Sequence, residues 1–371
     1  MARRVVIAMS GGVDSSVAAA LLVRQGFDVI GLMMRLWGEP TQDVAFNRCC
    51  TPDALAQARR VAAQLGIPFY AIDAQTVFKR RIVDFFIDSY AAGLTPNPCI
   101  ECNRHIRWEF LLDQALELGA DFLATGHYAR VRDAGAAGLQ LLKAVDANKD
   151  QSYVLSVLGQ AQLRRARFPL GELTKPEVRA IAREIGLPVA DRPESQDLCF
   201  LADGDYRRFL RDHAPGSLRP GPIVRRDGTV LGEHQGLPLY TIGQRKGIRV
   251  SSPEPLYVIA LRPADNALVV GAAAELGRAG LIADRVHWIA GAAPSETIQA
   301  DVKIRYKALP QPAMITPLPD GRARVLFETR LRDITAGQAA VFYQGDVCLG
   351  GGLIAREWDD MDPIEPAPRN A

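Results

Sequence analysis

Short apolar runs alternate with longer amphipathic segments through the first two hundred residues, and this alternation limits the fold more than any other feature of the sequence. Strands are predicted at Val5–Met9, Val29–Met34, Phe69–Ile72 and Phe122–Thr125. Helices are predicted at Ser16–Gln25, Pro52–Leu65, Phe78–Tyr90, Ile106–Leu118 and Pro176–Ile185. Alternation of this kind predicts an α/β fold, a doubly wound and mostly parallel sheet with helices on both faces.

The pattern changes after this region. Residues 202–255 are rich in glycine, proline and arginine, which predicts a small connecting domain. Short strands separated by turn residues then predict a C-terminal antiparallel barrel or sandwich, at Leu256–Leu261, Ala267–Val270, Val302–Tyr306, Arg324–Glu328, Ala339–Tyr343 and Val347–Leu353. We expect a catalytic domain at 1–201, a central domain at 202–277, a β-barrel at 278–358 and a tail at 359–371.

Charge and composition exclude several classes of protein. The 371 residues include 44 basic and 42 acidic side chains, so a nucleic-acid partner would have to bind local basic patches. The apolar run Val5–Met9 is too short for a signal peptide, and no stretch approaches the roughly 18 apolar residues of a membrane helix. Six cysteines scattered over a long chain do not form a disulfide framework. We expect a cytoplasmic enzyme with reduced thiols and no membrane contact.

The sharpest local motif is Ser10-Gly11-Gly12-Val13-Asp14-Ser15-Ser16, between the first predicted strand and the first predicted helix. Adjacent glycines let backbone N–H groups approach an anion, and the helix points its positive end at the same place. The serines add hydroxyl donors, and Asp14 could orient the loop or help to hold Mg²⁺. Unlike a Walker loop, the motif has no lysine, and nothing supplies one to the β- and γ-phosphates. That suits transfer of AMP with release of pyrophosphate; the alternative is an ordinary turn capped by Ser10 or Ser15.

Four further segments occur in order after this loop: Thr95–Asn103, Ala124–Tyr128, Lys149–Tyr153 and Tyr240–Gly247. Together with the loop they resemble the bacterial tRNA-specific 2-thiouridylases of the N-type ATP-pyrophosphatase superfamily. The resemblance implies an adenine-nucleotide α-hydrolase-like domain, a small central domain and a C-terminal β-barrel. It also implies 2-thiolation of the wobble uridine (U34) in the tRNAs for lysine, glutamate and glutamine, with ATP and Mg²⁺ and with sulfur carried on a cysteine persulfide.

The resemblance assigns residues to two binding functions. ATP contacts are expected from Ala8, Met9, Ser10, Gly11, Gly12, Val13, Asp14, Ser15, Met34 and Gly126, with Asp14 also taking part in catalysis. tRNA contacts are expected from Asn97, Pro98, Cys99, His127, Lys149, Asp150, Gln151, Arg305, Tyr306 and Gln338, the first three at the target base. Judged without the family, Met34 would be plain core, His127 a structural histidine and Lys149–Gln151 the start of a helix. Arg245 and Lys246 are either phosphate contacts or solvated side chains.

The cysteines divide into two groups. By resemblance, Cys199 carries the persulfide and Cys102 is the second catalytic thiol, which can form a disulfide with it; the sulfur would come from a relay protein or a cysteine desulfurase. Arg104, His105 and Arg107 follow Cys102 and could lower the pKa of its thiol. Cys99 could be a spare thiol, a base contact or a ligand, and an iron–sulfur cluster on Cys99, Cys102 and Cys199 is an open alternative. The remaining cysteines, Cys49, Cys50 and Cys348, are expected to be structural or incidental.

Two other functions remain open from the sequence. One is a synthetase of the same superfamily that adenylates a small carboxyl or ureido substrate without tRNA. The other is a non-catalytic RNA-binding protein that retains a nucleotide-binding fold. The synthetase alternative gives no reason for the paired cysteines, and the RNA-binding alternative would be favoured if no thiolated nucleoside formed with ATP, a sulfur donor and tRNA.

Overall fold

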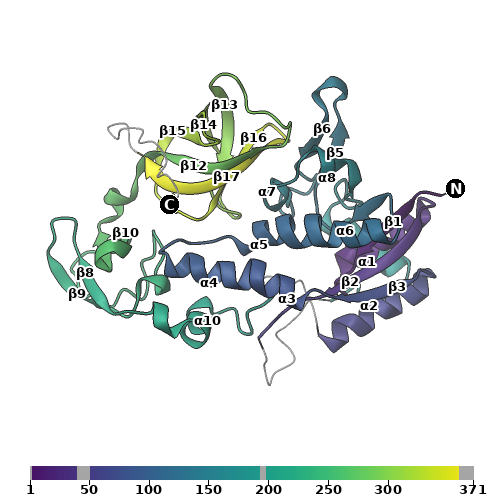
Figure 1. The fold of residues 1–371 in the computed structure, drawn as a ribbon, viewed down its shortest axis with the longest axis horizontal. Helices are drawn as coiled ribbons and strands as arrows, with labels where there is room; N and C mark the ends of the chain where they lie inside the picture. The colour runs from purple at the N-terminus through teal and green to yellow at the C-terminus, as the bar shows by residue number, and fades with distance from the viewer. Residues whose placement is uncertain (1, 40–50, 193–197, 359–371) are drawn as a thin grey trace.

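The computed structural model describes residues 2–39, 51–192 and 198–358 (Figure 1). Its N-terminal sheet has the order β3-β2-β1-β4-β7, from β1 (Arg4–Ala8), β2 (Asp28–Arg35), β3 (Phe69–Asp73), β4 (Phe122–Ala124) and β7 (Ala166–Arg167). Every pairing between these strands is parallel. The predicted parallel sheet is confirmed, although the short strand β7 was not expected.

Helices cover both faces of this sheet. One layer consists of α1 (Val13–Arg24), α2 (Pro52–Leu65) and α9 (Lys175–Glu184), and the other of α6 (Leu111–Glu117), α7 (Ser152–Leu155) and α8 (Gln160–Arg165). Val5 and Ile7 are buried against the first layer, and Val6 against the second. Because successive side chains of a strand point to opposite faces, a continuous apolar run is what a sheet covered on both sides requires.

Two helices begin earlier than the sequence predicted. The helix expected at Phe78–Tyr90 runs from α3 (Gln75–Phe78) through a π-helical stretch (Lys79–Val83) into α4 (Asp84–Ala91). The helix expected at Ile106–Leu118 runs from α5 (Pro98–Glu101) through a π-helical stretch (Cys102–Phe110) into α6.

The early start of the second helix has a local cause. The Asn97 side chain caps it by accepting a hydrogen bond from the N–H of Ile100 at 3.3 Å, and Pro98 stands in the first turn. Cys99 and Cys102 consequently lie in the first turns of a long helix rather than in a loop before it.

A second sheet forms the middle of the chain. It follows α10 (Tyr206–His213) and has the order β10-β11-β8-β9, from β8 (Gly221–Val224), β9 (Val230–His234), β10 (Tyr257–Arg262) and β11 (Ala267–Gly271). The strands β10 and β11 therefore do not join the later strands of the chain. Short 3-10 turns lie at Gly135–Ala137, Pro215–Ser217, Leu237–Leu239, Pro263–Asp265 and Ala273–Leu276.

The C-terminal strands form the predicted antiparallel barrel. Its strands are β12 (Arg278–Trp288), β13 (Ile298–Lys303), β14 (Gln311–Pro317), β15 (Ala323–Leu331), β16 (Ala339–Gln344) and β17 (Val347–Trp358), and it closes through β12 and β17. The predicted strand Val302–Tyr306 is partly wrong, because β13 ends at Lys303 and Arg305 and Tyr306 lie in the following turn. The strands β12 and β14 were not predicted.

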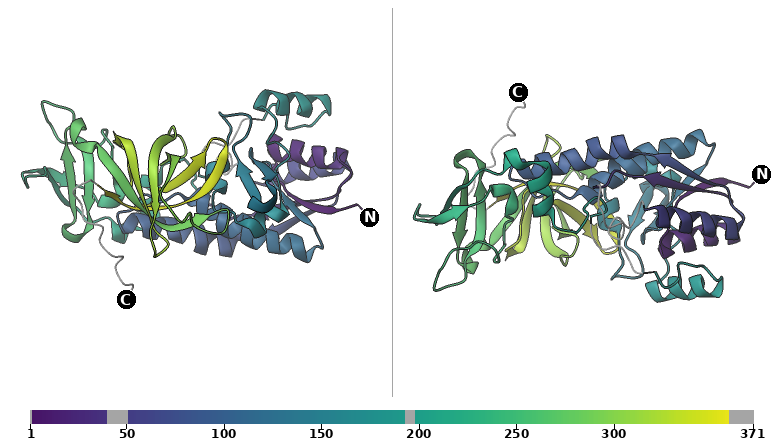
Figure 2. Two further views of the ribbon diagram at one scale, coloured as in Figure 1. Left: turned by 90° about the horizontal axis from the view of Figure 1, so that it is seen from above. Right: turned by 90° about the horizontal axis from the view of Figure 1, so that it is seen from below.

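A hairpin of the N-terminal domain extends the barrel. Strands β5 (Arg130–Asp133) and β6 (Leu139–Leu142) pair with each other, and β6 also pairs with β17, where Leu142 faces Val347. The parallel sheet and the middle sheet lie at opposite ends of the molecule, with the barrel between them (Figures 1 and 2). Among the described residues, no helix has both the length and the apolar character needed to span a bilayer.

Two glycines of the barrel, Gly345 and Gly350, both have positive φ but differ in how closely other atoms approach them. Gly350 has φ +129°, and a Cβ there would lie 2.0 Å from the carbonyl oxygen of His287. Gly345 has φ +58°, with no atom within 4 Å of its Cβ position.

We predict that Gly345→Ala costs about 1 kcal/mol of stability through backbone strain alone. Gly350→Ala should cost about 3 kcal/mol or more, because the backbone must also shift. Thermal unfolding of both variants checks this, and equal losses would contradict it.

Candidate active site

The turn between β1 and α1 is held in one conformation by its neighbours. Gly11 has φ +71°, and a Cβ there would lie 2.4 Å from the carbonyl oxygen of Ala54 in α2, so a side chain does not fit. The hydroxyls of Ser15 and Ser16 both donate to the carbonyl of Gly12, at 3.2 and 2.8 Å. These two hydroxyls therefore brace the loop itself, whereas the sequence suggested donors for an anion. The backbone N–H groups at the start of α1 are the donors that such a turn offers.

The expected nucleotide contacts gather at one edge of the sheet. Ala8 ends β1, Met34 stands near the end of β2, and Gly126 follows β4. These strands are adjacent and parallel, so their carboxyl ends meet. Gly126 also passes close to α1, because a Cβ on it would lie 2.8 Å from the backbone nitrogen of Ser15. Ligands of open α/β sheets bind at this edge.

A buried lysine reaches this loop from a distant segment. The ammonium of Lys175, at the start of α9, lies 2.7 and 2.8 Å from the two carboxylate oxygens of Asp14. The hydroxyl of Tyr128 donates to the same carboxylate at 2.8 Å. The motif itself contains no lysine, but the fold brings Lys175 to this loop. No sequence motif around Lys175 predicts this contact, because it depends on the packing of α9 beside α1.

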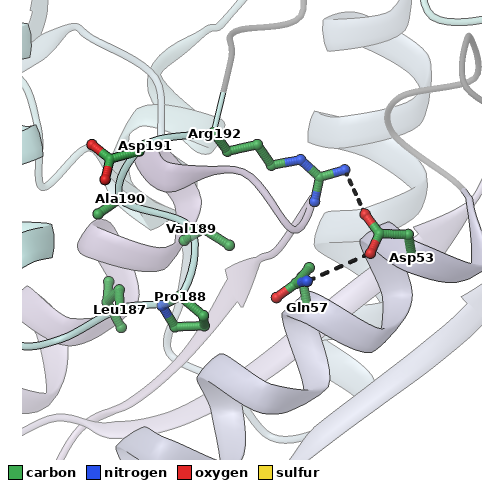
Figure 3. A pocket seen from close by; sticks show the side chains of 8 residues that line it. All are labelled: Asp53, Gln57, Leu187, Pro188, Val189, Ala190, Asp191 and Arg192. Carbon is green, nitrogen blue, oxygen red and sulfur yellow. Dashed lines mark hydrogen bonds and ion pairs between the residues drawn. The ribbon is translucent and has the colours of Figure 1, made fainter.

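An arginine braces the other side of the loop. Arg192 donates to the carbonyl of Gly11 at 3.0 Å and forms an ion pair with Asp53 of α2 at 3.1 Å. Figure 3 shows this side chain reaching across a cavity of about 400 Å³ between α2 and the segment Leu187–Arg192. No sequence motif identified Arg192, because its partners are a backbone carbonyl and a remote helix.

Both predicted catalytic cysteines contact one apolar cluster. Cys102 is buried in it with aromatic residues such as Phe86 and Phe200, and Cys199 packs against it as a half-buried side chain. Met34 packs against the same cluster. The structure therefore places both thiols at one cluster, which also packs against Met34 near the end of β2. The Glu194–Asp197 part of the motif around Cys199 lies outside the described residues.

A buried carboxylate anchors the segment that contains Cys199. The N–H of Ala202 donates to Glu39 at 2.8 Å, and the N–H of Glu39 donates to the carbonyl of Phe200 at 3.4 Å. Arg208 binds both carboxylate oxygens, at 2.7 and 2.6 Å, and His213 lies 2.9 Å away. Burial alone would raise the pKa of Glu39, but these hydrogen bonds hold the pKa below its usual range. The sequence did not single out Glu39.

The cysteines do not form a metal site in this arrangement. Cys99 is exposed on α5, whereas Cys102 is buried. Across the described ranges, which include Cys99, Cys102 and Cys199, no three His, Cys, Asp or Glu side chains are grouped to hold a metal ion. These thiols therefore do not fit the iron–sulfur alternative. A Mg²⁺ ion on nucleotide phosphates is a different case, since it needs only one or two carboxylates.

The barrel contacts the segment that leads into α5. The side-chain amide of Gln338 donates to the carbonyl oxygens of Thr95 and Pro96, at 2.9 and 3.2 Å. The N–H of Thr95 donates to the carbonyl of Ala336 at 2.9 Å. Gln338 thus fixes the two residues directly before Asn97, Pro98 and Cys99.

An aromatic and cationic group lies beside this contact. The Tyr306 ring is partly exposed and lies 6.0 Å from the Tyr153 ring, and the Lys303 ammonium lies 5.6 and 5.7 Å from the two rings. Burial lowers the pKa of Lys303, and the nearby Asp150 carboxylate opposes this effect. Burial raises the pKa of Tyr306, and the charges of Asp150 and Cys99 add to this effect. Lys303 was missed from the sequence, although it stands three residues before Tyr306.

The remaining expected tRNA residues serve the fold in this structure. Asp150 accepts hydrogen bonds from the N–H groups of Ala144 and Ser152, at 3.0 and 3.1 Å, and so caps the start of α7. The Gln151 side chain accepts from the N–H of Tyr128 at 3.0 Å. Lys149 stands in the turn just before them. The helix start expected on local grounds is therefore present.

Arg305 and the turn 240–247 meet at a junction. Arg305 donates to the hydroxyl of Thr335 and, at 3.4 Å, to the carbonyl of Ile242. Arg305 therefore joins the barrel to the middle sheet. Arg245 and Lys246 in the same turn are exposed.

His127 is a buried neutral imidazole. Its Nδ1 lies 2.7 Å from the Thr125 hydroxyl, and its Nε2 lies 2.9 Å from the Arg107 guanidinium. Arginine can only donate, so Nε2 is the acceptor and Nδ1 carries the proton. Burial first, and then the charge of Arg107, lowers the pKa of His127 well below 6.5.

This pKa shift makes stability depend on pH. Below about pH 6.5 the unfolded chain protonates His127 but the folded chain does not, so the free energy of unfolding should fall as pH falls. We predict that His127→Gln removes about 1.4 kcal/mol per pH unit from the slope between roughly pH 6 and 5. Urea unfolding at several pH values measures the slope, and an identical slope in the variant would contradict the assignment.

Comparisons with known proteins agree with this geometry. Family models match residues 3–203 as a tRNA methyl transferase HUP domain, 207–272 as a tRNA methyl transferase PRC-barrel domain and 278–354 as an aminomethyltransferase β-barrel domain. The tRNA-specific 2-thiouridylase MnmA of Chloroflexus aurantiacus is 53% identical over 95% of this chain and 98% of that protein. The protein of the same name from Roseiflexus castenholzii is 49% identical over 95% of this chain and 100% of that protein.

Solved structures match more loosely. A 4-thiouridine synthetase–RNA complex with bound ATP shares 16% identity at a TM-score of 0.34, covering 58% of this chain and 51% of that one. The relatives in sequence decide the assignment, since they match along nearly their whole length. The chain belongs to the family of the tRNA-specific 2-thiouridylases.

Proposed function

We propose that this protein uses ATP to replace the C2 oxygen of the wobble uridine (U34) of tRNA with sulfur, giving 2-thiouridine, AMP and pyrophosphate. The observation that carries the proposal is the contact of Cys102, Cys199 and Met34 with one apolar cluster, since Met34 stands near the end of β2, the strand that pairs with β1 before the glycine loop. The relatives' name, tRNA-specific 2-thiouridylase, supports it. An enzyme that only adenylated a small molecule would have no use for two thiols at this edge.

The first step activates the base. The uracil C2 oxygen attacks the α-phosphorus of ATP, the bond from that phosphorus to the bridging oxygen breaks, and pyrophosphate leaves while the N3 proton departs. We assign ATP binding to Ala8–Ser15, Met34 and Gly126, whose backbone and apolar surfaces surround the sheet edge. Mg²⁺ would accompany the phosphates and neutralise their charge. Asp14, the only carboxylate in residues 10–16, would hold that ion.

The second step delivers sulfur. The terminal sulfur of a Cys199 persulfide attacks C2, and the Cys102 thiolate attacks the Sγ of Cys199. The persulfide bond breaks, its electron pair stays on the transferred sulfur, AMP leaves C2, and a proton returns to N3. Cys102 and Cys199 end as a disulfide, so a dithiol reductant must reduce it. A relay protein or a cysteine desulfurase must then supply a new persulfide.

We assign binding of the target base to the surface between the N-terminal domain and the C-terminal barrel. Asn97, Pro98 and Cys99 would meet the flipped uracil, and the other contacts would come from His127, Lys149, Asp150, Gln151, Arg305, Tyr306 and Gln338. Tyr306 is the best placed for an unstacked base, because its exposed ring offers a stacking surface. Gln338 and Asp150 would act through the segments that they hold. His127, whose ring is buried, would act through Arg107.

The proposal assigns catalysis and tRNA binding to different domains. Residues 1–201 would carry out the chemistry, and 202–277 and 278–358 would hold the tRNA. The substrates would be the tRNAs for lysine, glutamate and glutamine in the cytoplasm, where reduced thiols persist.

The two sulfur roles predict different defects. Cys199→Ser should lower 2-thiouridine formation at least about a thousandfold and leave ATP binding intact, because the hydroxyl cannot carry a persulfide. Cys348→Ala is the control: Cys348 is buried in the barrel, and burial raises the pKa of its thiol to about 12. Mass spectrometry of nucleosides from tRNA incubated with ATP and a persulfide donor measures the product. Full activity of Cys199→Ser would refute the persulfide role.

A further inference from the structure

We infer that Lys175 is the pyrophosphate-binding cation of the nucleotide site, an inference that rests on the proposed use of ATP. The seven residues of the glycine loop contain no cation. The ammonium of Lys175 nevertheless lies at the second residue of α1, held between both oxygens of Asp14 and 5.8 Å from the centre of the Tyr128 ring.

Lys175 stands where a cation is costly, and its ion pair with Asp14 offsets that cost. Lys175 is only 8% exposed, and a buried ammonium costs free energy unless it is paired, here with both oxygens of Asp14. It also stands in the first turn of α9, where the positive end of the helix disfavours a cation. The turn has its own capping box, in which the Glu177 carboxylate accepts from the N–H of Thr174 at 2.7 Å. The helix therefore does not need Lys175 to begin.

The backbone around Lys175 fixes where its side chain starts. Its own N–H donates to the carboxylate of Asp146 at 2.9 Å. The side chain is a flexible four-carbon stem, so its ammonium can move by a few ångströms while the backbone stays in place. The ammonium already contacts the Asp14 carboxylate at the start of α1, so it can also reach an anion bound at the start of that helix.

The location favours the β- and γ-phosphates over the nucleoside. Met34 and Gly126, the proposed contacts of the nucleoside part, come from the ends of β2 and β4. Lys175 lies at the N-terminus of α1, where the helix dipole and the loop N–H groups favour an anion. Negative charge develops on pyrophosphate as its bond to the α-phosphorus breaks. A cation at this place stabilises that charge without taking part in attack on the base.

The test separates binding of pyrophosphate from binding of AMP. Lys175→Gln should weaken pyrophosphate and ATP at least about tenfold, the loss of one charge-assisted contact, and leave AMP within about twofold. Lys175→Arg should recover part of the loss. The control is Arg183→Gln, which removes an exposed charge from the same helix and should change neither ligand. Isothermal titration with each ligand, without tRNA or a sulfur donor, gives the affinities.

A second variant covers a loss of folding in Lys175→Gln. Lys175→Arg keeps the charge and the ion pair with Asp14, so it should bind pyrophosphate more tightly than Lys175→Gln does. Unchanged pyrophosphate binding or equal losses of AMP and pyrophosphate in Lys175→Gln, or pyrophosphate binding no tighter in Lys175→Arg than in Lys175→Gln, would overturn the inference and leave the proposed thiolation standing. A wild-type protein that binds neither ATP nor pyrophosphate would overturn both.

Discussion

The Asp14 carboxylate joins three segments that are far apart in the sequence, and the nucleotide edge of the sheet depends on this junction. It sits at the start of α1, receives the hydroxyl of Tyr128 from the segment after β4, and binds the ammonium of Lys175 from α9. Without a side chain at Gly11, the loop can approach α2 closely enough to keep its shape. The result is a turn in which the ammonium that pairs with Asp14 comes from outside the glycine motif.

The barrel contacts the segment that leads into α5, where the proposed site begins. Gln338 and the backbone of Ala336 hold Thr95 and Pro96, so the barrel positions the residues that precede Cys99. Pairing of β6 with β17 makes the same connection from a second direction. Because these contacts are short and polar, moving the barrel would move the start of α5. The proposed RNA-binding domain and the start of α5, which contains Cys99, are thereby held together.

The sequence predicted what depends on local pattern and missed what depends on packing. The apolar runs and amphipathic segments were sufficient to predict the parallel sheet, because a strand that is buried on both faces appears in the sequence as a continuous apolar run. The start of α5 was missed although Asn97 and Pro98 form a recognisable cap, because the helix period was followed only from Ile106. The strand β7 has only two residues and is too short for any periodicity to show. Lys175, Arg192 and Glu39 could not be found from the sequence, since each acts on a partner more than a hundred residues away.

The central claim is that ATP activates the C2 oxygen of the base before sulfur arrives. Transfer RNA with ¹⁸O at C2 of the wobble uridine tests it directly, by mass spectrometry of the nucleotide products after one round of thiolation. The account predicts that the label appears in the phosphate of AMP, because that oxygen becomes bonded to the α-phosphorus. Label in water, in inorganic phosphate or in pyrophosphate, with thiolation intact, would contradict it.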